Sequence, residues 1–295
     1  MKVLVFGSAN IDRTYHVNHF VDAMETISAD KMESFCGGKG FNQAIAFARA
    51  GSDVHFAGAV GVDGEMLINT LKDEGINIEH VKEANEPSGH AIIQVTPDGQ
   101  NSIIILAGAN ASITHEDVDE VLASFDKGTL VVLQNEISSV DYIIDQAKER
   151  EMLIALNPSP FNEKVNSYDL SKVDYLLLNE VEAALLTGCS ETENMADAVH
   201  EKYPDLNVVL TLGSEGSVFV SNDGNKLTSG VLHIDAVDTT AAGDTYTGFF
   251  LSEILETGNA EAALRNAAIA SGLAVSRSGA SQSIPTLSEV KSRKF

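Results

Sequence analysis

Short apolar runs recur along the chain, and most of them are followed by a segment whose apolar residues repeat with helical spacing. Short runs with few polar residues are typical of strands that are buried on both faces of a parallel sheet. A repeated order of strand and then helix predicts a parallel sheet with helices on both faces. The runs lie at residues 2–6, 54–60, 130–133, 153–156, 175–178 and 208–212.

The expected helices are marked by apolar stripes and by the residues at their ends. Gly51 and Gly75 stand where C-terminal caps belong, and Gly258 separates two consecutive helices near the end of the chain. The second of these two is rich in alanine and other small residues, which allow helices to pack closely. The expected ranges are 41–50, 66–74, 141–150, 245–256 and 260–275.

One stretch departs from this order. Residues 91–95 and 103–106 flank Pro97-Asp98-Gly99 and predict a β-hairpin, which residues 14–17 could join. We therefore expect a small β-sheet lid, built from about 13–36 and 88–108, over the carboxyl edge of the parallel sheet, where α/β proteins bind ligands. Because no linker, repeat or low-complexity segment divides the chain, residues 1–295 are expected to form a single α/β domain.

The composition is that of a globular and strongly acidic chain. Of its 295 residues, 44% are hydrophobic and 21% are charged, and the net charge is −24. A negative field of this size repels nucleic acids and anionic lipid surfaces, so neither is an expected partner. Two cysteines far apart in sequence, no signal-peptide pattern and no apolar run of about 18 residues predict a soluble cytoplasmic protein with no membrane partner.

Two segments carry the pattern of a ligand site. The first is CGGKGFN (36–42), which precedes the first strong helix. Its glycines let a backbone approach a polar ligand closely, although a glycine-rich turn before a helix has the same appearance. It is not a Walker A loop, because Gly40 stands where that motif needs Ser or Thr.

The second segment is DTTAAGDT (238–245), which opens directly into a helix. A helix N-terminus offers unpaired N–H groups and a partial positive charge, which stabilise a transferring phosphoryl group. Asp244 would be held ionised there and could accept a proton from a substrate hydroxyl as a general base. Taken alone, it could equally be an ordinary acid in the first turn of a helix.

Together, the two segments resemble the ribokinase-like carbohydrate kinase family, and the resemblance covers essentially the whole chain. Further matching segments are Gly7–Asp12, Gly108–Asn110, Leu133–Glu136, Asn157–Pro160 and Asn179–Glu182. The resemblance implies a three-layer α/β/α fold with a central, mostly parallel sheet and a small β-sheet lid. It also implies transfer of the γ-phosphoryl group of ATP to the 5-hydroxyl of D-ribose, with Mg²⁺ and K⁺, and a homodimer formed through the lid.

The resemblance also implies roles for individual residues. Asp244 becomes the base that takes the proton from the sugar hydroxyl, and the backbone of Ala241, Ala242, Gly243 and Asp244 forms the anion hole. A pentose offers hydroxyls that donate and accept, and polar groups of the expected kinds suit it. The implied sugar-binding residues are Asn10, Asp12, Gly38, Lys39, Asn42 and Glu136.

The nucleotide and the ions are assigned in the same way. The resemblance implies that Asn179, Thr211, Gly213, Ser214, Gly216 and Gly243 bind ATP, although 211–216 could also be a plain strand-to-strand turn. Mg²⁺ would be held by Glu182 through water, with Asn179 beside it, as this ion prefers. The implied K⁺ site consists of Asp238, Thr240, Ala274, Arg277, Gly279 and Ser283.

Some positions depart from the family pattern. Ala241 stands where the family commonly has Gly, which is acceptable only if this residue does not need a positive φ. Met24-Glu25-Thr26 replaces the usual Pro-Gly-Glu-Thr in the loop toward the lid. The sugar therefore stays open between ribose and another acceptor, such as deoxyribose, fructose or a nucleoside. A catalytically silent sugar-binding regulator is a further alternative.

Overall fold

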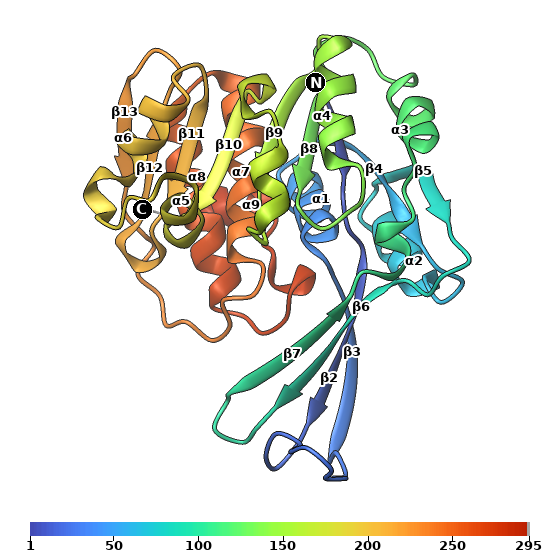
Figure 1. The fold of residues 1–295 in the computed structure, drawn as a ribbon. Helices are drawn as coiled ribbons and strands as arrows, with labels where there is room; N and C mark the ends of the chain where they lie inside the picture. The colour runs from blue at the N-terminus through green and yellow to red at the C-terminus, as the bar shows by residue number, and fades with distance from the viewer. Residues whose placement is uncertain (294–295) are drawn as a thin grey trace.

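Nine strands form the central sheet of the computed structural model, which describes residues 1–293 (Figure 1). Neighbouring strands are parallel except for the last two strands of the chain, which add an antiparallel hairpin at one edge of the sheet. In order across the sheet, the strands are β13 (Lys226–Ser229), β12 (Ser217–Val220), β11 (Asn207–Thr211), β10 (Tyr175–Asn179), β9 (Leu153–Asn157), β8 (Leu130–Gln134), β1 (Lys2–Phe6), β4 (Asp53–Val60) and β5 (Asn77–Glu83).

Helices cover both faces of this sheet, so alternate side chains of its strands enter two different cores. In β1, Val3 and Val5 belong to one core, and Leu4 and Phe6 belong to the other. The first core packs against α1 (Lys39–Arg49), α2 (Glu65–Asp73), α7 (Ala242–Thr257), α8 (Ala260–Val275) and α9 (Leu287–Ser292). The second packs against α3 (His115–Leu122), α4 (Val140–Glu149), α5 (Glu180–Thr187) and α6 (Thr192–Lys202).

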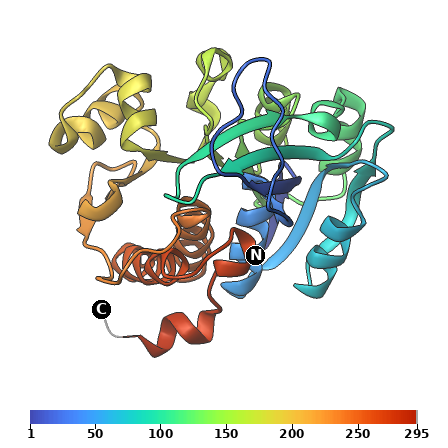
Figure 2. The same ribbon diagram turned by 90° about the horizontal axis from the view of Figure 1, so that it is seen from below.

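A separate four-stranded sheet, called the small sheet here, projects from the end of the central sheet (Figure 1). Its order is β3 (Lys31–Gly37), β2 (Asn10–His16), β6 (Gly89–Val95) and β7 (Asn101–Leu106), with only β2 and β6 parallel. Seen from below, it extends over the ends of the central strands (Figure 2). The expected hairpin is therefore present as β6 and β7, and residues 14–16 join it through β2, with Val17 N–H donating to Val95 O just beyond the strand.

The central apolar runs all form the expected strands, whereas seven further elements were not expected, among them β12, which is buried along its whole length. The elements not expected from the sequence are α3, α5, α6, α9, β5, β12 and β13. Helix α7 begins at Ala242 rather than at Thr245. The short 3₁₀ helices are η1 (Gly108–Ala111), η2 (Glu163–Ser167), η3 (Leu170–Lys172), η4 (Gly213–Glu215) and η5 (Ser281–Ser283). Within residues 1–293, no helix has both the length and the apolar character that crossing a bilayer requires.

Candidate active site

A cavity of about 1070 Å³ lies between the carboxyl ends of the central strands and the small sheet. It brings together sixteen of the site residues expected from the sequence, namely Asn10, Asp12, Gly38, Lys39, Asn42, Glu136, Asn179, Glu182, Thr211, Asp238, Thr240, Ala241, Ala242, Gly243, Asp244 and Gly279. Six others do not line it in the described part of the chain: Gly213, Ser214, Gly216, Ala274, Arg277 and Ser283.

Asp244 is buried in the first turn of α7, with only 7% of its surface exposed. Its carboxylate accepts hydrogen bonds from Asn42 Nδ2 at 3.1 Å and from Gln43 Nε2 at 3.0 Å. Burial raises the pKa of Asp244 above its ordinary value, although the Lys39 charge and the two amide donors oppose the shift. A carboxylate with a raised pKa is a better proton acceptor near neutral pH, so Asp244 has the properties of a general base.

A second layer of buried amides orients the donors to Asp244. Gln134 Nε2 donates to Gln43 Oε1 at 2.7 Å, and this fixes which end of the Gln43 amide faces the carboxylate. The same Gln43 nitrogen is 3.3 Å from Asn157 Oδ1. Sequence analysis did not identify Gln43 or Gln134 as site residues, because neither stands at a position to which the resemblance assigns a role.

Close packing between α1 and α7 places these donors beside Asp244. A Cβ atom at Gly248 of α7 would lie only 2.5 Å from Ala46 Cβ of α1 and 2.8 Å from the Ala46 backbone. The missing side chain at Gly248 therefore allows the two helices to approach closely. Asn42 and Gln43 lie one turn before Ala46, so this contact sets their distance to Asp244.

The N-terminus of α7 leaves backbone donors free at the cavity. Ala242 N–H donates to Thr239 O at 3.2 Å, and Thr245 N–H donates to Ala241 O at 2.8 Å. The N–H groups of Gly243 and Asp244 therefore have no acceptor within residues 1–293, as expected in a first helical turn. A Cβ at Gly243 would meet nothing within 4 Å, so this glycine leaves open space for a ligand.

Ala241 has a positive φ, which the sequence analysis took to be unfavourable for an alanine at this position. It is the N-cap residue of α7 and has a φ of +59°, in the left-handed region that favours glycine. For an alanine this conformation costs about 1–2 kcal/mol. Both the N–H and the hydroxyl of Thr245 donate to the Ala241 carbonyl at 2.8 Å, and these bonds hold the strained residue in place.

At the opposite side of the cavity, Asn10 and Glu136 are fixed by their neighbours. The Asn110 amide donates to Asn10 Oδ1 at 2.8 Å and accepts from Ala9 N–H at 3.1 Å, which leaves the Asn10 amide nitrogen available to a ligand. Ser8 Oγ donates to Glu136 Oε2 at 2.5 Å, and Lys39 N–H donates to the same oxygen at 2.9 Å. The positioning roles of Ser8 and Asn110 were not predicted.

The charges around Lys39 alter the titration of the site. Burial, and to a smaller extent the nearby Glu136 charge, raise the pKa of Asp12 to about 6. Burial lowers the pKa of the Lys39 ammonium, but the surrounding carboxylates Asp244, Glu136 and Glu182 outweigh this effect and raise it above its ordinary value. Lys39 therefore stays charged and supplies a positive centre in an otherwise acidic cavity.

The small sheet gives the cavity an apolar roof. Asn10, Asp12, Thr14, Glu33 and Asn101 of this sheet also line the cavity, but just over half of the side chains that its strands contribute are hydrocarbon. The hydrocarbon side chains are Phe35, Ala91, Ile93, Val95, Ile103 and Ile105. The floor, formed by the ends of the central strands and the start of α7, is mostly polar, and Asn10 and Asp12 add polar groups from the small sheet. This combination suits a hydroxyl-rich ligand held by the polar groups and shielded from water by the hydrocarbon.

Asn179 and Glu182 pair with each other at the start of α5. Glu182 N–H donates to Asn179 Oδ1 at 2.9 Å, and Asn179 N–H donates to Glu182 Oε2 at 3.0 Å. Within residues 1–293 the other Glu182 oxygen has no donor, and no group of three or more His, Cys, Asp and Glu could hold a metal ion directly. This arrangement fits Mg²⁺ held mainly by phosphates and water, with Glu182 binding a water ligand.

The residues assigned to a monovalent cation form two connected groups and one separate residue. The Asp238 carboxylate accepts from Thr240 N–H at 2.9 Å and from Gly279 N–H at 3.0 Å, and Arg277 N–H donates to Ala274 O at 3.1 Å. Burial acts to raise the pKa of Asp238, but the Thr240 and Gly279 donors outweigh it and lower the pKa. The Ser283 hydroxyl instead donates to Ala280 O. The side-chain and carbonyl oxygens of this set are hard ligands and suit K⁺.

The segment 211–216 forms a turn between two strands, and its role in binding ATP stays a prediction. Helix η4 joins β11 to the antiparallel β12. Within residues 211–216, Thr211 lines the cavity. Gly216 has a φ of +101°, and a Cβ there would lie 2.1 Å from Ser229 O, so backbone packing against β13 accounts for this glycine.

Comparisons with known proteins agree with this geometry. The family model described as pfkB family carbohydrate kinase matches residues 1–287. A ribokinase from Haemophilus influenzae is 34% identical over 97% of this chain and 95% of its own length, and a deoxyribokinase from Salmonella typhi is 31% identical over 98% and 97%. The structure of Arabidopsis thaliana ribokinase complexed with ribose and ATP is 31% identical and superposes with a TM-score of 0.86 over 99% of this chain and 97% of that one. These matches confirm the fold class expected from the sequence.

Proposed function

Because this chain belongs to the pfkB family of carbohydrate kinases, we propose that it transfers the γ-phosphoryl group of ATP to the 5-hydroxyl of D-ribose. The observation that carries the proposal is the buried Asp244 carboxylate beside two free N–H groups, in one cavity with a hydroxyl-binding floor. Asn42 Oδ1 supports the same reading, because it is buried without a donor in the described residues and suits a ligand hydroxyl.

The reaction follows from these positions. Asp244 accepts the proton of the 5-hydroxyl while the hydroxyl oxygen forms a bond to the γ-phosphorus and the bond to the β-phosphate oxygen breaks. The N–H groups of Gly243 and Asp244 donate to the phosphoryl oxygens as charge develops on them, and the helix N-terminus adds its partial positive charge. The Lys39 ammonium contributes a positive charge to the same cavity.

Two ions complete the proposal. Mg²⁺, when bound, neutralises phosphate charge, and Glu182 and Asn179 would hold its water ligands. K⁺ would be held by Asp238, Thr240 and Gly279 together with carbonyls of Ala274 and Arg277 and the Ser283 hydroxyl. By binding Thr240, next to Ala241, the carboxylate of Asp238 connects this cation site to the anion hole.

We also propose a homodimer formed through the small sheet. Its edge strand β7 exposes Ile103, Ile104, Ile105 and Leu106, by 51% to 64% of their surfaces. An exposed apolar edge strand is prone to aggregation, so pairing with a second copy would stabilise it. A cytoplasmic location stays a prediction.

Deoxyribose is the second candidate substrate, because the deoxyribokinase relative is nearly as similar as the ribokinases. The Asp12 carboxylate favours ribose, since vicinal hydroxyls supply it with donors. A 2-deoxy sugar would leave one acceptor unpaired, which costs about 1–3 kcal/mol.

The proposal is tested by ADP release from Mg–ATP with D-ribose, 2-deoxyribose, fructose and common nucleosides, each with K⁺ and with a counter-cation too large to bind. We expect the highest kcat/KM with ribose and a stimulation by K⁺. A higher kcat/KM with another acceptor would show that the protein is a kinase but that ribose is not its preferred substrate. Ribose binding without ADP release from any acceptor would favour a catalytically silent regulator.

Asp244→Asn separates catalysis from binding. Because burial disfavours the charged carboxylate, the variant should be at least as stable as the unaltered protein, while its kcat should fall about 10²–10⁴-fold with ribose affinity retained. Asp141→Asn is the matched control, since Asp141 is an exposed acid in the first turn of α4. A kcat for Asp244→Asn close to that of the control would exclude Asp244 as the base.

A further inference from the structure

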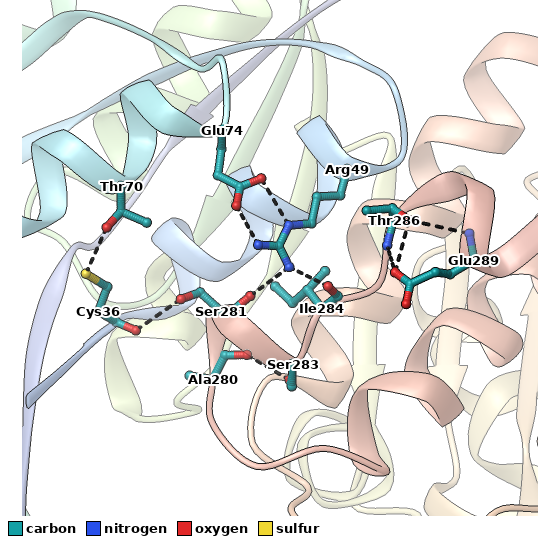
Figure 3. Close-up of polar contacts among 10 residues, drawn as sticks. All are labelled: Cys36, Arg49, Thr70, Glu74, Ala280, Ser281, Ser283, Ile284, Thr286 and Glu289. Carbon is teal, nitrogen blue, oxygen red and sulfur yellow. Dashed lines mark hydrogen bonds and ion pairs between the residues drawn. The ribbon is translucent and has the colours of Figure 1, made fainter. Parts of the chain in front are cut away.

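One guanidinium connects α1, α2 and the loop 278–284, and part of this loop lines the active-site cavity. Arg49, the last residue of α1, forms a two-point ion pair with Glu74 at the end of α2, with distances of 3.0 Å from Nε and 2.5 Å from Nη2. Its third nitrogen, Nη1, donates to Ser281 O at 3.2 Å and also to Ile284 O (Figure 3). The planar fork of Arg can serve both partners at once, whereas Lys cannot.

The segment that Arg49 binds belongs to the cavity wall. Ser278, Gly279, Ala280 and Gln282 line the cavity, and Gly279 N–H is bound by Asp238. Arg49 thus binds the loop 278–284 on the side away from the cavity, while Asp238 binds it on the cavity side. The position of Gly279 relative to Asp238 depends on both contacts.

The same loop also contacts the base of the small sheet. Ser281 Oγ donates to the carbonyl of Cys36 at 3.4 Å, and Cys36 Sγ lies 3.4 Å from Thr70 Oγ1 of α2 (Figure 3). Cys36 and Ser281 are both buried. The loop, α1, α2 and the end of β3 therefore form one contiguous set of contacts.

Arg277 and Thr286, which flank the loop on its two sides, are anchored independently of Arg49. Arg277 pairs with Glu289 at 2.6 Å, and Thr286 N–H donates to the same carboxylate at 2.8 Å. These bonds lower the pKa of Glu289 to about 2, with the Thr286 N–H as the largest cause. Loss of the Arg49 contacts should therefore displace the loop 278–284 and leave Arg277 and Thr286, on either side of it, attached to Glu289.

We propose that Arg49, oriented by Glu74, is a positioning residue that sets the loop 278–284 and thereby the cation-binding groups around Gly279 and Asp238. The inference rests on the proposed function, because it concerns the K⁺ site proposed there. Arg49 acts through the loop, and the predicted effect of its loss is on cation affinity and on turnover rather than on sugar binding.

The test compares Arg49→Lys, which keeps the charge and loses the fork, with Arg150→Lys. Arg150 is the matched control, because it also stands at the end of a helix, pairs with Asp119 at 3.3 Å and donates to Gln146 O at 3.0 Å, but it does not contact the loop 278–284. Two quantities are measured: the K⁺ concentration that produces half of the K⁺-dependent rise in melting temperature, and kcat and KM for ribose.

For Arg49→Lys we expect the half-maximal K⁺ concentration to rise about fivefold or more and kcat to fall about tenfold, with the ribose KM nearly unchanged. Glu74→Gln should shift both quantities in the same direction by less, and Arg150→Lys should shift neither. A lower melting temperature for Arg49→Lys with an unchanged K⁺ response would overturn the inference, because Arg49 would then be only structural. If K⁺ leaves the melting temperature of the unaltered protein unchanged, the proposed cation site fails and the inference fails with it.

Discussion

At the scale of single residues, Asp12 has the titration most open to measurement, since burial and Glu136 raise its pKa to about 6. Below that pH the carboxyl is neutral and accepts hydrogen bonds less strongly. We expect the ribose KM to rise as pH falls from about 7 to about 5, and Asp12→Asn to remove this dependence. Glu33→Gln is the control, because Glu33 is a carboxylate of the same small sheet. A flat KM profile in the unaltered protein would contradict the assignment.

The raised pKa of Asp12 also makes the free energy of unfolding depend on pH. The folded state binds the Asp12 proton more tightly than the unfolded state does, because the pKa is raised from 3.8. The contribution of this group to stability is therefore present at low pH and is lost as the pH rises through about 6. Urea unfolding of Asp12→Asn should show a shallower loss of stability across this window than the unaltered protein does.

Ala241 offers a second test at this scale, because its positive φ is a strained conformation. Ala241→Gly relieves the strain but adds freedom to the unfolded chain, so we expect a net gain of about 0.5–1 kcal/mol in the free energy of unfolding. Ala242→Gly, one residue later and inside the helix, should lose about the same amount. Equal changes for the two variants in denaturant unfolding would show that Ala241 is not strained.

Site prediction from the sequence worked where the signal was local. Asp244 and Asn42 stand in short segments next to helix starts, and the structure brings both into one cavity. Gln43, Gln134 and Asn110 act through hydrogen bonds to residues far away in the chain, and the spacing of a sequence carries no trace of such contacts. The backbone ligands assigned to K⁺ are hard to recognise for the same reason, since any residue has a carbonyl.

At the scale of elements, the approach of α1 to α7 decides whether Asp244 receives its two amide donors. Gly248→Ala would place a Cβ 2.5 Å from Ala46 Cβ, so the helices must separate. We expect a loss of about 1–3 kcal/mol of stability and a lower kcat, because Asn42 and Gln43 would move with α1.

Gly230→Ala is the control for this change, since a Cβ there would meet nothing within 4 Å and its φ is not positive. Thermal unfolding and steady-state kinetics measure the two effects. If Gly248→Ala loses stability but keeps its kcat, the helix contact supports the fold without positioning the donors.

Prediction of elements succeeded for six strands with apolar residues on both faces and failed for most elements that lack this signal, although β12, buried but only four residues long, was also missed. Strands β1 and β8 are buried along almost their whole length, whereas β5 lies at the sheet edge with alternating partly exposed residues. The early start of α7 was missed because its first turn, Ala-Gly-Asp, has no apolar periodicity. The bonds to Thr239 and Ala241 set this start, and they depend on the folded loop.

At the scale of the whole molecule, the small sheet predicts the oligomeric state. Ile104 lies between Ile103 and Ile105, which line the cavity, so in a strand it points to the opposite face. We expect the unaltered protein to sediment as a dimer, and Ile104→Glu to raise the dimer dissociation constant about 30-fold or more. Thr228→Glu, on the exposed edge strand β13, is the control and should stay dimeric. A monomeric unaltered protein would contradict the proposed interface.

The apolar roof formed by the small sheet bears on a competing reaction of the whole enzyme. Water is a smaller acceptor than any sugar and is present at far higher concentration, so an open site beside ATP would waste the nucleotide by hydrolysis. Phe35, Ile93 and Ile105 offer no hydrogen bonds that would order a water molecule above the reacting atoms. Under the proposed function, the hydrocarbon of the roof favours transfer to the bound acceptor over transfer to water, so selectivity for the sugar depends on both sheets together.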